Sequence, residues 1–430
     1  MEEQAAGPVA ARPRAGAFHG TFRSLRVRNF RLFIFGQMLS GIGPWMQWVA
    51  APWLVLQLTN SGVALGIDTA LSTLPILLFG AWGGVIADRF DNRKVLVWTQ
   101  AIYAVLALVL FALDATDVVQ VWHVYLLSFL TGMVAAVDMP TRQTFYLEMV
   151  GREDLTNAMS LNTATFTGSR IVGPVIAGAM IGTVGTATVF LVNGVTYLAV
   201  VIALAAMRVS EMHARERVAR ARGQIREGVR YAWETSTLRL PMIVMAIVFT
   251  FAFNFAVLMP LLAVRSFEGG AGTFAWLLAL SGVGSLAGAL MMAGRSGKAN
   301  ARGVAWFAII LGVFSMLLAI SPGLPAAIAA APFVGGAAIA FAITGNATLQ
   351  LNAAPELRGR VMALYTIIFI GSTPIGGPIA GVVGEHIGPR VGLAGGAVIA
   401  LLAGLWALSA LRGQHQPAVE LVRSSADDAA

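Results

Sequence analysis

The sequence predicts an all-α integral membrane protein with twelve transmembrane helices in two pseudo-symmetric six-helix bundles. Of its 430 residues, 57% are hydrophobic and only 12% are charged, whereas soluble proteins carry roughly 25% charged residues. Long uncharged runs recur along the chain, and special residues match each other at a fixed offset, which indicates an internal repeat. Together these observations predict that most of the chain lies in a bilayer.

The uncharged runs define the predicted helices, because most of them reach the roughly 18 to 20 residues that a helix needs to cross hydrocarbon. Turn residues divide the longest runs at 58–62 (LTNSG), 182–185 (GTVG) and 321–325 (SPGLP). The divided runs give about twelve helices, and an even number places both termini on one side. The runs are 32–67, 69–87, 95–113, 118–137, 155–169, 171–207, 240–264, 269–294, 303–355, 361–384 and 391–411.

The basic residues predict the orientation of these helices. On this arrangement 26 of the 29 Lys and Arg residues lie on the side of the two termini, Arg265 and Arg390 lie on the other side, and Arg170 lies within a helix. Because basic loops stay in the cytoplasm, both termini and the loop 83–94 are predicted to be cytoplasmic. We therefore expect a multi-pass protein of a bacterial-type inner (plasma) membrane.

A hydrophilic stretch after the sixth predicted helix separates the two halves. Within it, Ile225, Val229, Ala232 and Trp233 share one helical face, which predicts an amphipathic helix on the membrane surface. A disordered basic linker describes 208–221 better. The predicted segments are a cytoplasmic N-terminal segment (1–30), an N-terminal bundle (31–207), a linker (208–239), a C-terminal bundle (240–412) and a cytoplasmic tail (413–430).

Several other classes of protein are excluded by composition and motifs. The net charge of +8 is spread over short flanks of the predicted helices, so no separate domain is available for nucleic acid. The chain has no cysteine, and it lacks the clustered nucleophiles, bases or metal ligands of an enzyme. The stretch GRSGKA (294–299) lacks the first glycine of a phosphate-binding loop. We expect no cofactor and no metal, and segment 1–30 lacks the apolar core of a signal peptide.

An offset of 204 residues superposes the two halves. Gly84 then meets Gly288, Lys94 meets Lys298, and the pair Gly173 and Pro174 meets Gly377 and Pro378, while Gly80 meets Gly284. An offset that spans six helices preserves their direction, so the repeats are parallel, as in transporters built from two bundles.

The stretch GGVIADRFDNRK (83–94) resembles the signature loop between the second and third helices of the major facilitator superfamily. The stretches FRLFIFGQMLSGIGPWMQWVAAPWLVLQLTNS (30–61), DMPTRQTF (138–145), REDLTNAMSLN (152–162) and PELRGRVMALY (355–365) are similar to the branch that contains the enterobactin exporter and macrolide efflux proteins. The resemblance covers roughly residues 22–412, and it implies the major facilitator fold and alternating access.

The same resemblance implies a cytoplasmic gate. In the family, the acid at Asp88 reaches the start of the eleventh helix when the inner side is closed, where the helix dipole and nearby basic groups stabilise a carboxylate. The second repeat has Met292 in place of Asp88, so the gate is one-sided. The predicted gate residues are Gly84, Asp88, Arg89, Arg93, Lys94, Asp138, Arg142, Arg358 and Arg360.

The stretch GSRIVGPVIAG (168–178) is similar to the Gly-Pro signature of the superfamily's antiporters. Independently, Pro174 removes one helical hydrogen bond, and Gly168, Gly173 and Gly178 permit close packing. The expected partner is the eighth helix, with Gly282, Gly284 and Gly288. Packing alone is the alternative to an antiporter role.

Two charged residues lie within predicted helices, where insertion costs roughly 2.5 to 3.5 kcal/mol. Asp68 is a candidate proton carrier, because a buried carboxyl can load and release protons. An interfacial Asp of constant charge is the alternative. Arg170 is either an anion-binding group in the transport path or a hydrogen-bonding hub of its helix, and a direct pair with Asp68 is a further hypothesis.

Polar and aromatic groups of the first and seventh helices complete the predicted path. The run FTFAFNF (249–255), together with the first helix, suits a cavity for a bulky, partly aromatic ligand, and aromatic packing is the alternative. Many relatives have an acid near Pro44, which this chain lacks, so proton coupling falls to Asp68. The predicted path residues are Gln37, Trp45, Gln47, Trp48, Arg170 and Asn254.

These features predict a secondary active efflux transporter that exchanges protons for a small amphipathic compound, a drug or a siderophore. The alternative is a proton symporter or importer of a small polar metabolite on the same fold. The expected partners are the small-molecule substrate, protons and the lipid bilayer, and we expect a monomer.

Overall fold

The computed structural model describes residues 22–213, 224–293, 299–355 and 357–413. Every regular element within these residues is a helix. The first group of helices comprises η1 (Arg23–Arg26), α2 (Arg28–Thr59), α3 (Gly62–Arg89), α4 (Asn92–Ala115), α5 (Val121–Ala205) and η2 (Val209–Glu211). The second group comprises α6 (Gln224–Glu234), α7 (Ser236–Ala252), α8 (Phe255–Arg265), α9 (Ala271–Ala293), α10 (Ala301–Ala319), α11 (Leu324–Asn352), α12 (Arg358–Gly371), α13 (Thr373–His386) and α14 (Pro389–Gly413).

Two of the helix ends lie where turn residues predict them. After α2 the residue Asn60 adopts a left-handed φ of 49°, and the hydroxyl of Ser61 then accepts the N–H of Ala64 at 3.2 Å as the N-cap of α3. The stretch SPGLP separates α10 from α11. Most of segments 1–30 and 413–430, and Lys298 in the second repeat, lie outside the described residues.

α5 is 85 residues long, and it contains two glycines at which the backbone leaves the helical conformation. Gly151 has a φ of 71° and Gly185 has a φ of 84°, values that glycine adopts without steric cost. Gly185 is the last residue of the predicted turn GTVG. The two glycines divide α5 into segments 121–150, 152–184 and 186–205, which match the predicted fourth, fifth and sixth helices.

Two breaks interrupt runs that the sequence presents as continuous. Phe253 and Asn254 separate α7 from α8, and Ser372 separates α12 from α13. The break at Phe253 and Asn254 carries no glycine or proline, which explains why turn signals do not mark it, whereas Gly371 and Pro374 flank the break at Ser372. Interrupted helices are common at binding sites of transporters, where they free backbone groups in the middle of the membrane.

Nine stretches of helix within the described residues are long and apolar enough to cross a membrane. α5 counts once among these nine, and α7 with α8 and α12 with α13 form single stretches. α2, with 32 residues, is not among them. When α2 is added and α5 is divided at its two glycines, the helices match the twelve predicted spans, a count that stays a prediction.

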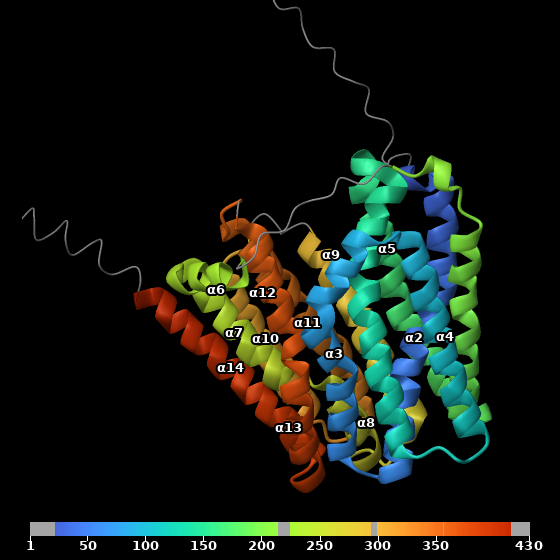
Figure 1. The fold of residues 1–430 in the computed structure, drawn as a ribbon. Helices are drawn as coiled ribbons and strands as arrows, with labels where there is room; N and C mark the ends of the chain where they lie inside the picture. The colour runs from blue at the N-terminus through green and yellow to red at the C-terminus, as the bar shows by residue number, and fades with distance from the viewer. Residues whose placement is uncertain (1–21, 214–223, 294–298, 356, 414–430) are drawn as a thin grey trace, which may run out of the picture.

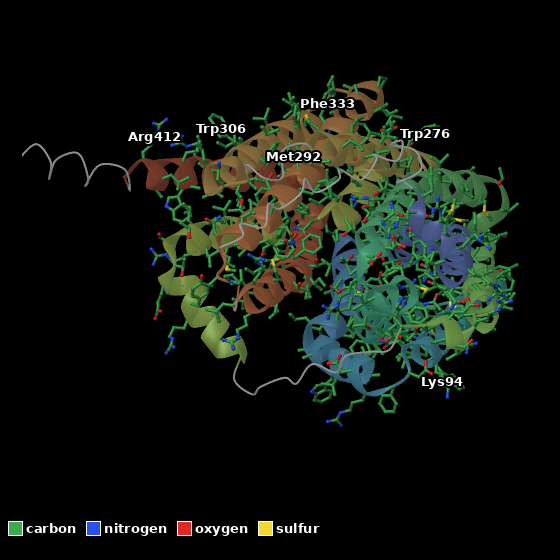
Figure 2. All side chains as sticks on the ribbon, turned by 90° about the horizontal axis from the view of Figure 1, so that it is seen from above. Lys94, Trp276, Met292, Trp306, Phe333 and Arg412 are labelled. Atoms are coloured by element: carbon green, nitrogen blue, oxygen red, sulfur yellow. The ribbon has the colours of Figure 1, made fainter. Side chains whose placement is uncertain are left out.

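The two groups of helices stand side by side, with α3 packed against α12 and α13 and with α5 packed against α9 (Figure 1). We call the end at which α2 begins and α3 ends the basic end, and the opposite end, with the α2–α3 and α13–α14 turns, the far end. Large apolar side chains such as Trp276, Trp306 and Phe333 are 52–57% exposed on the periphery (Figure 2). Such a surface fits a surrounding of lipid.

The predicted amphipathic helix is present as α6 at the basic end. Ala232 is buried, and the Tyr231 hydroxyl accepts the N–H of Ala354 at 3.1 Å, so α6 is fixed next to α12. Val229 and Trp233 of the predicted apolar face are exposed. They are therefore available to the membrane surface.

Candidate functional site

The two groups of helices approach each other most closely where glycines of α3 and α13 meet. A Cβ on Gly66 would lie 2.6 Å from the carbonyl oxygen of Gly377, and a Cβ on Gly62 would lie 2.8 Å from that of Gly381. Side chains at these positions would force the helices apart. This contact occupies the half of α3 that leads to the far end, so the two groups are held together there.

A polar clamp joins the same elements at the far end. The carboxylate of Glu385 accepts hydrogen bonds from the Ser61 hydroxyl at 2.5 Å and from the Val63 N–H at 2.8 Å. Arg265 donates to the carbonyl oxygen of Asn60 at 2.7 Å and to that of Glu385 at 3.0 Å. Residues of α8 and α13 therefore bind the turn that starts α3, and we call these groups the far-end clamp.

The glycines of the 168–178 segment divide into two kinds. A Cβ on Gly173 would lie 2.5 Å from the Cβ of Trp45, and Gly178 packs against Ala275 of α9. Gly168 corrects the prediction of close packing, because a Cβ there would meet no heavy atom within 4 Å. Pro174 is buried within α5.

Only one of the three glycines of α9 that were expected to meet the fifth predicted helix does so. Gly282 faces the backbone of Arg170 and Ile171, as expected for a contact with the fifth predicted helix. Gly284 and Gly288 instead approach Pro332 and Gly336 of α11. Residues 284 and 288, which are four apart, share one face of α9, and this face points away from the face of residue 282 that meets α5.

Arg170 lies against an aromatic cluster in the middle of the first group. Its guanidinium carbon is 5.5 Å from the ring centroid of Trp45. Trp45 in turn meets Trp48 at 5.5 Å and Phe166 at 5.4 Å in edge-to-face contacts. Trp48 and Phe166 are 41% and 57% exposed. The cluster thus joins a cation to aromatic surface that no protein group covers.

The other predicted path residues lie in three separate places. Gln47 accepts a hydrogen bond from Asn193 of α5, so it joins two helices of the first group. The side-chain nitrogen of Gln37 is buried without a hydrogen-bond acceptor. Asn254, at the break between α7 and α8, donates to the carbonyl oxygen of Thr250 at 2.7 Å and packs against Gly376.

The Phe-rich run of the seventh predicted helix forms an aromatic core in the second group. Phe249 is 2% exposed, and its ring lies 4.9 Å from Phe369 and 5.4 Å from Phe341. Phe369 is 41% exposed. The packing interpretation therefore describes Phe249, while Phe369 offers an uncovered aromatic face.

Asp68 is buried within the first group. It interacts with Ser128 of α5, and its Oδ1 atom has no hydrogen-bond donor. Asp68 and Arg170, both in the described part of the chain, form no ion pair with each other. The hypothesis that they pair is therefore wrong for this conformation, because Asp68 faces α5 while Arg170 stacks on Trp45 of α2.

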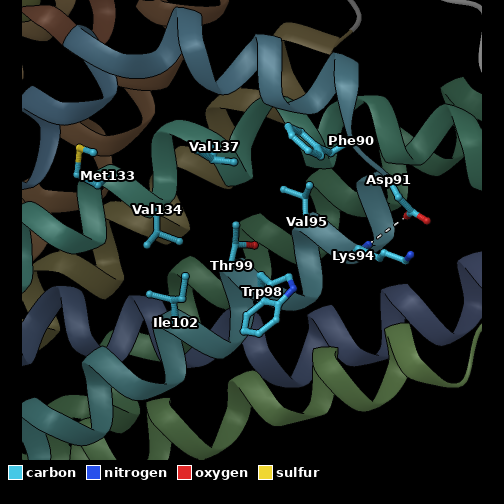
Figure 3. A pocket seen from close by; sticks show the side chains of 10 residues that line it. All are labelled: Phe90, Asp91, Lys94, Val95, Trp98, Thr99, Ile102, Met133, Val134 and Val137. Atoms are coloured by element: carbon cyan, nitrogen blue, oxygen red, sulfur yellow. Dashed lines mark hydrogen bonds between the residues drawn. The ribbon is translucent and has the colours of Figure 1, made fainter.

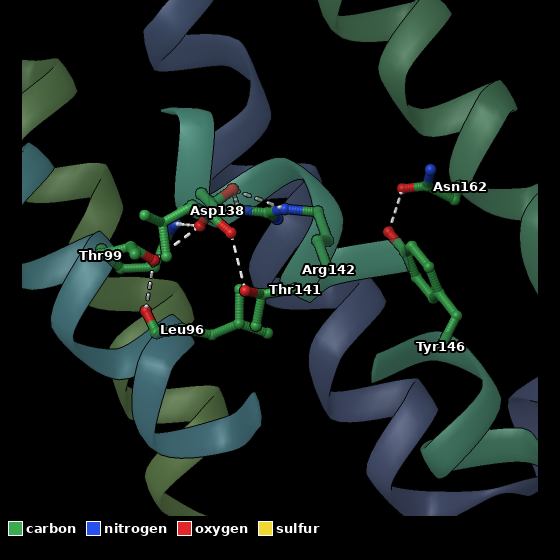
Figure 4. Close-up of polar contacts among 9 residues, drawn as sticks. Leu96, Thr99, Asp138, Thr141, Arg142, Tyr146 and Asn162 are labelled. Atoms are coloured by element: carbon green, nitrogen blue, oxygen red, sulfur yellow. Dashed lines mark hydrogen bonds and ion pairs between the residues drawn. The ribbon is translucent and has the colours of Figure 1, made fainter. Parts of the chain in front are cut away.

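Asp138 and Arg142 form the most highly connected polar cluster of the first group (Figure 4). Arg142 donates from Nε at 3.0 Å and from Nη2 at 2.8 Å to Oδ2 of Asp138. The other carboxylate oxygen accepts from Thr99 at 2.6 Å and from Gln100 at 2.9 Å. Asp138 is 5% exposed. The pair thus joins α4 to α5 inside the first group.

The remaining predicted gate residues lie at the basic end. Gly84 and Asp88 belong to the last turns of α3, Arg89 ends it, and Arg358 and Arg360 begin α12. Arg93 donates to the carbonyl oxygens of Leu204 at 2.6 Å and Ala205 at 3.1 Å. It therefore binds the end of α5 within its own group.

Comparison with known proteins identifies the family. A family model described as transmembrane secretion effector matches residues 19–426. The multidrug efflux pump Tap of Mycolicibacterium fortuitum is 30% identical over 376 residues, which cover 83% of this chain and 90% of that protein. The chain belongs to the transmembrane secretion effector family of the major facilitator superfamily. It is an efflux transporter of this superfamily, and not an enzyme.

Further similarities support the family and the fold. The staphyloferrin A transporter of Staphylococcus aureus is 26% identical over 40% of this chain and 44% of that protein. Solved structures of bacterial homologues of the lysosomal transporter Spinster and of the iron transporter ferroportin share the fold at 14% identity. Their TM-scores are 0.71 and 0.70, and they cover 90% and 89% of this chain and 97% and 98% of their own. The predicted family and all-α membrane fold are therefore confirmed.

Several residues of the far-end clamp and of the polar contacts within the first group were not identified from the sequence. Ser61 and Glu385 of the far-end clamp, and Asn193, Thr99 and Gln100, were not singled out. The position of Glu385 at the end of an apolar run was a usable signal, because it places an acid at the same end as Arg265. Thr99 and Gln100, which bind Asp138, and Asn193, which binds Gln47, carry no local signal because they lie on other helices than the residues they bind.

We predict that Glu385→Gln opens the far end more often. A hydrogen bond to a charged acceptor contributes roughly 1.5 to 3 kcal/mol when buried, and for this partly exposed group we expect about 1 kcal/mol, a roughly five-fold shift in population. The measurement is the rate at which a membrane-impermeant thiol reagent, added at the far end, modifies Cys introduced in place of Thr69, since the chain has no native cysteine.

The matched control is Asp117→Asn, which removes an acid at the same end outside the clamp. We expect it to leave the modification rate of the Cys at position 69 unchanged. An equal rate in Glu385→Gln and in the parent would show that the clamp does not hold the far end closed.

Proposed function

We propose that this transporter exports a small amphipathic compound, a drug or a siderophore, in exchange for protons. The bundles 31–207 and 240–412 rock against each other about a central path, with the linker 208–239 between them. The observation that carries the proposal is the far-end clamp together with the α3–α13 contact, because an alternating-access transporter needs a breakable closure between its halves. The basic end faces the cytoplasm, since most Lys and Arg residues lie there.

In this orientation the conformation is closed to the outside. The contacts between halves run along α3 from Gly62 at the far end to Leu77 near its middle, which packs against Gly371, and along α5 where Gly178 meets α9. In the opposite state we expect the complementary closure at the basic end, where Asp88 would meet the start of α12 and the basic groups Arg358 and Arg360. Such a contact exists in one state only, so it biases the transport equilibrium.

The aromatic cluster around Arg170 supports an amphipathic substrate. Trp48 and Phe166 offer uncovered rings beside Trp45. Arg170 forms no ion pair with a described carboxylate, so it is available to an anionic or polar substituent. Across the path, Phe369 presents a further ring, and the predicted path residue Asn254 lies buried at the break between α7 and α8. Relatives that are a multidrug efflux pump and a siderophore transporter favour the same class of substrate.

Asp68 is the proposed proton carrier. A buried carboxylate with one oxygen that lacks a donor is costly when charged, and binding of a proton removes that cost. The hydroxyl of Ser128 is the polar neighbour of the Asp68 carboxyl group. The transporter acts in the plasma membrane as a monomer with both termini in the cytoplasm, and its partners are the substrate, protons and lipid.

Export itself is tested by deletion of the gene from its host. We expect the deletion strain to become several-fold more sensitive to at least one antibiotic or to release less siderophore, and the intact gene to restore the phenotype. Unchanged resistance and secretion, with loss of uptake of some small polar solute, would favour the importer instead.

We predict that Asp68→Asn uncouples transport from protons. In vesicles with an imposed pH gradient, the variant should lose at least ten-fold of the gradient-driven accumulation, because Asn keeps the contact with Ser128 and cannot change its charge. Substrate exchange without a gradient should persist. The control is Asp117→Asn, an exposed acid, and full gradient-driven accumulation by Asp68→Asn would refute the carrier role.

A further inference from the structure

A groove with a volume of about 520 Å³ lies on the surface of the first group of helices. Figure 3 shows that α4 forms one wall and residues 133–137 of α5 form the other, with the α3–α4 turn at one end. Its volume falls within the roughly 300 to 1,000 Å³ typical of small-molecule sites. The groove is lined by residues of the first group, and it is distinct from the aromatic cluster at Arg170.

The walls of the groove are apolar and open to the surroundings. Trp98 is 70% exposed and Ile102 is 43% exposed, and Met133 and Val134 face them from α5. The stretch of α4 from Lys94 to Ile102 extends about 12 Å along the helix axis at 1.5 Å per residue. A groove of this shape, opened toward lipid, fits an acyl chain that lies along the helix.

The basic-end mouth of the groove carries one available cation. Lys94 is exposed, and its ammonium group forms no ion pair with a carboxylate in the described part of the chain. Asp91 at the same mouth serves as the N-cap of α4, since its carboxylate accepts the backbone N–H of Lys94 at 3.1 Å. Arg93 points to the end of α5 instead.

Tryptophan beside lysine is the arrangement of residues that meets lipid headgroups. Trp side chains favour the membrane interface, and Lys extends its ammonium group to the headgroups while its stem stays in the apolar layer. Trp98 follows Lys94 by one helical turn, so the headgroup and the upper acyl chain would meet them in this order. A basic residue near the surface attracts anionic lipid.

We propose that this groove binds an anionic phospholipid, with one acyl chain along Trp98, Ile102 and Val134 and the phosphate group on Lys94. The floor of the groove includes Thr99, which donates to Asp138. The bound chain therefore covers the side of α4 that supports the Asp138–Arg142 pair. Lys94 would thus bind the phosphate group of a lipid, and it also lies beside the proposed cytoplasmic gate.

Quenching of Trp98 fluorescence by brominated acyl chains tests the proposal. The protein is reconstituted in phosphatidylcholine vesicles that contain increasing fractions of brominated phosphatidylglycerol or brominated phosphatidylcholine. The signal of Trp98 is the difference between the parent and Trp98→Phe. We expect half-maximal quenching at a roughly five-fold lower fraction of the anionic lipid.

Three variants separate a specific site from general attraction. Lys94→Gln should abolish the preference, Lys94→Arg should keep it, and Arg412→Gln, which removes one exposed charge at the same end of the second group, should leave it unchanged. Equal quenching of the parent by the two lipids would show that bulk bilayer alone fills the groove and would overturn the proposal. Protection of Trp98 from both lipids by a transported drug would assign the groove to substrate and would overturn it as well.

Discussion

The close approach of α3 and α13 is the contact on which the arrangement of the two groups depends. In a bilayer no hydrophobic effect drives one apolar helix onto another, so association relies on close packing and hydrogen bonds. Gly62 and Gly66 on one helix and Gly377 and Gly381 on the other remove the side chains that would separate the backbones. The far-end clamp adds directional hydrogen bonds at the end of this contact. A closure built from small contacts of this kind can break and reform without the unfolding of either group.

Polar side chains within the membrane serve two purposes in this chain. The Asp138–Arg142 pair, with Thr99 and Gln100, and the pair of Gln47 and Asn193 satisfy one another inside the first group. If the Asp138–Arg142 pair lost one partner, an uncompensated buried charge would remain, which costs roughly 3 to 5 kcal/mol, so this pair holds the bundle together. The neutral amides of Gln47 and Asn193 add a hydrogen bond between α2 and α5. The groups whose partners are incomplete, Asp68 and Arg170, are the ones to which we assign proton and substrate.

The sequence predicted the parts of the fold that depend on local signals. Uncharged runs located the helices, and turn residues located the breaks near Asn60, Gly185 and Ser321, because glycine, proline and left-handed positions act on the nearest backbone. The break at Phe253 and Asn254 escaped prediction because it lies in an apolar run without such residues. At this break Asn254 donates to the carbonyl oxygen of Thr250 and lies against Gly376 of α13, contacts for which the sequence carries no local signal.

The site was less predictable than the fold, because its contacts depend on how separate helices pack against each other. Residue type identified Asp68, Arg170 and Trp45 as costly or distinctive in a membrane, but their partners depend on the relative rotation of helices. Thus Arg170 stacks on Trp45 rather than pairing with Asp68, and Gly168 faces open space although it shares a motif with Gly173. Glu385 binds Ser61 and Val63 because α13 lies beside the start of α3, and the sequence carries no signal for these partners.

The most direct test of alternating access measures both ends of the molecule at once. The chain has no cysteine, so labels can be attached at introduced positions alone. Spin labels at Val118→Cys and Ile387→Cys report on the far end, and labels at Phe90→Cys and Leu351→Cys report on the basic end. All four positions are exposed. Double electron–electron resonance in nanodiscs should show that a change of pH or addition of substrate lengthens the far-end distance and shortens the basic-end distance together. Distances that stay fixed, or that change at one end only, would contradict the account.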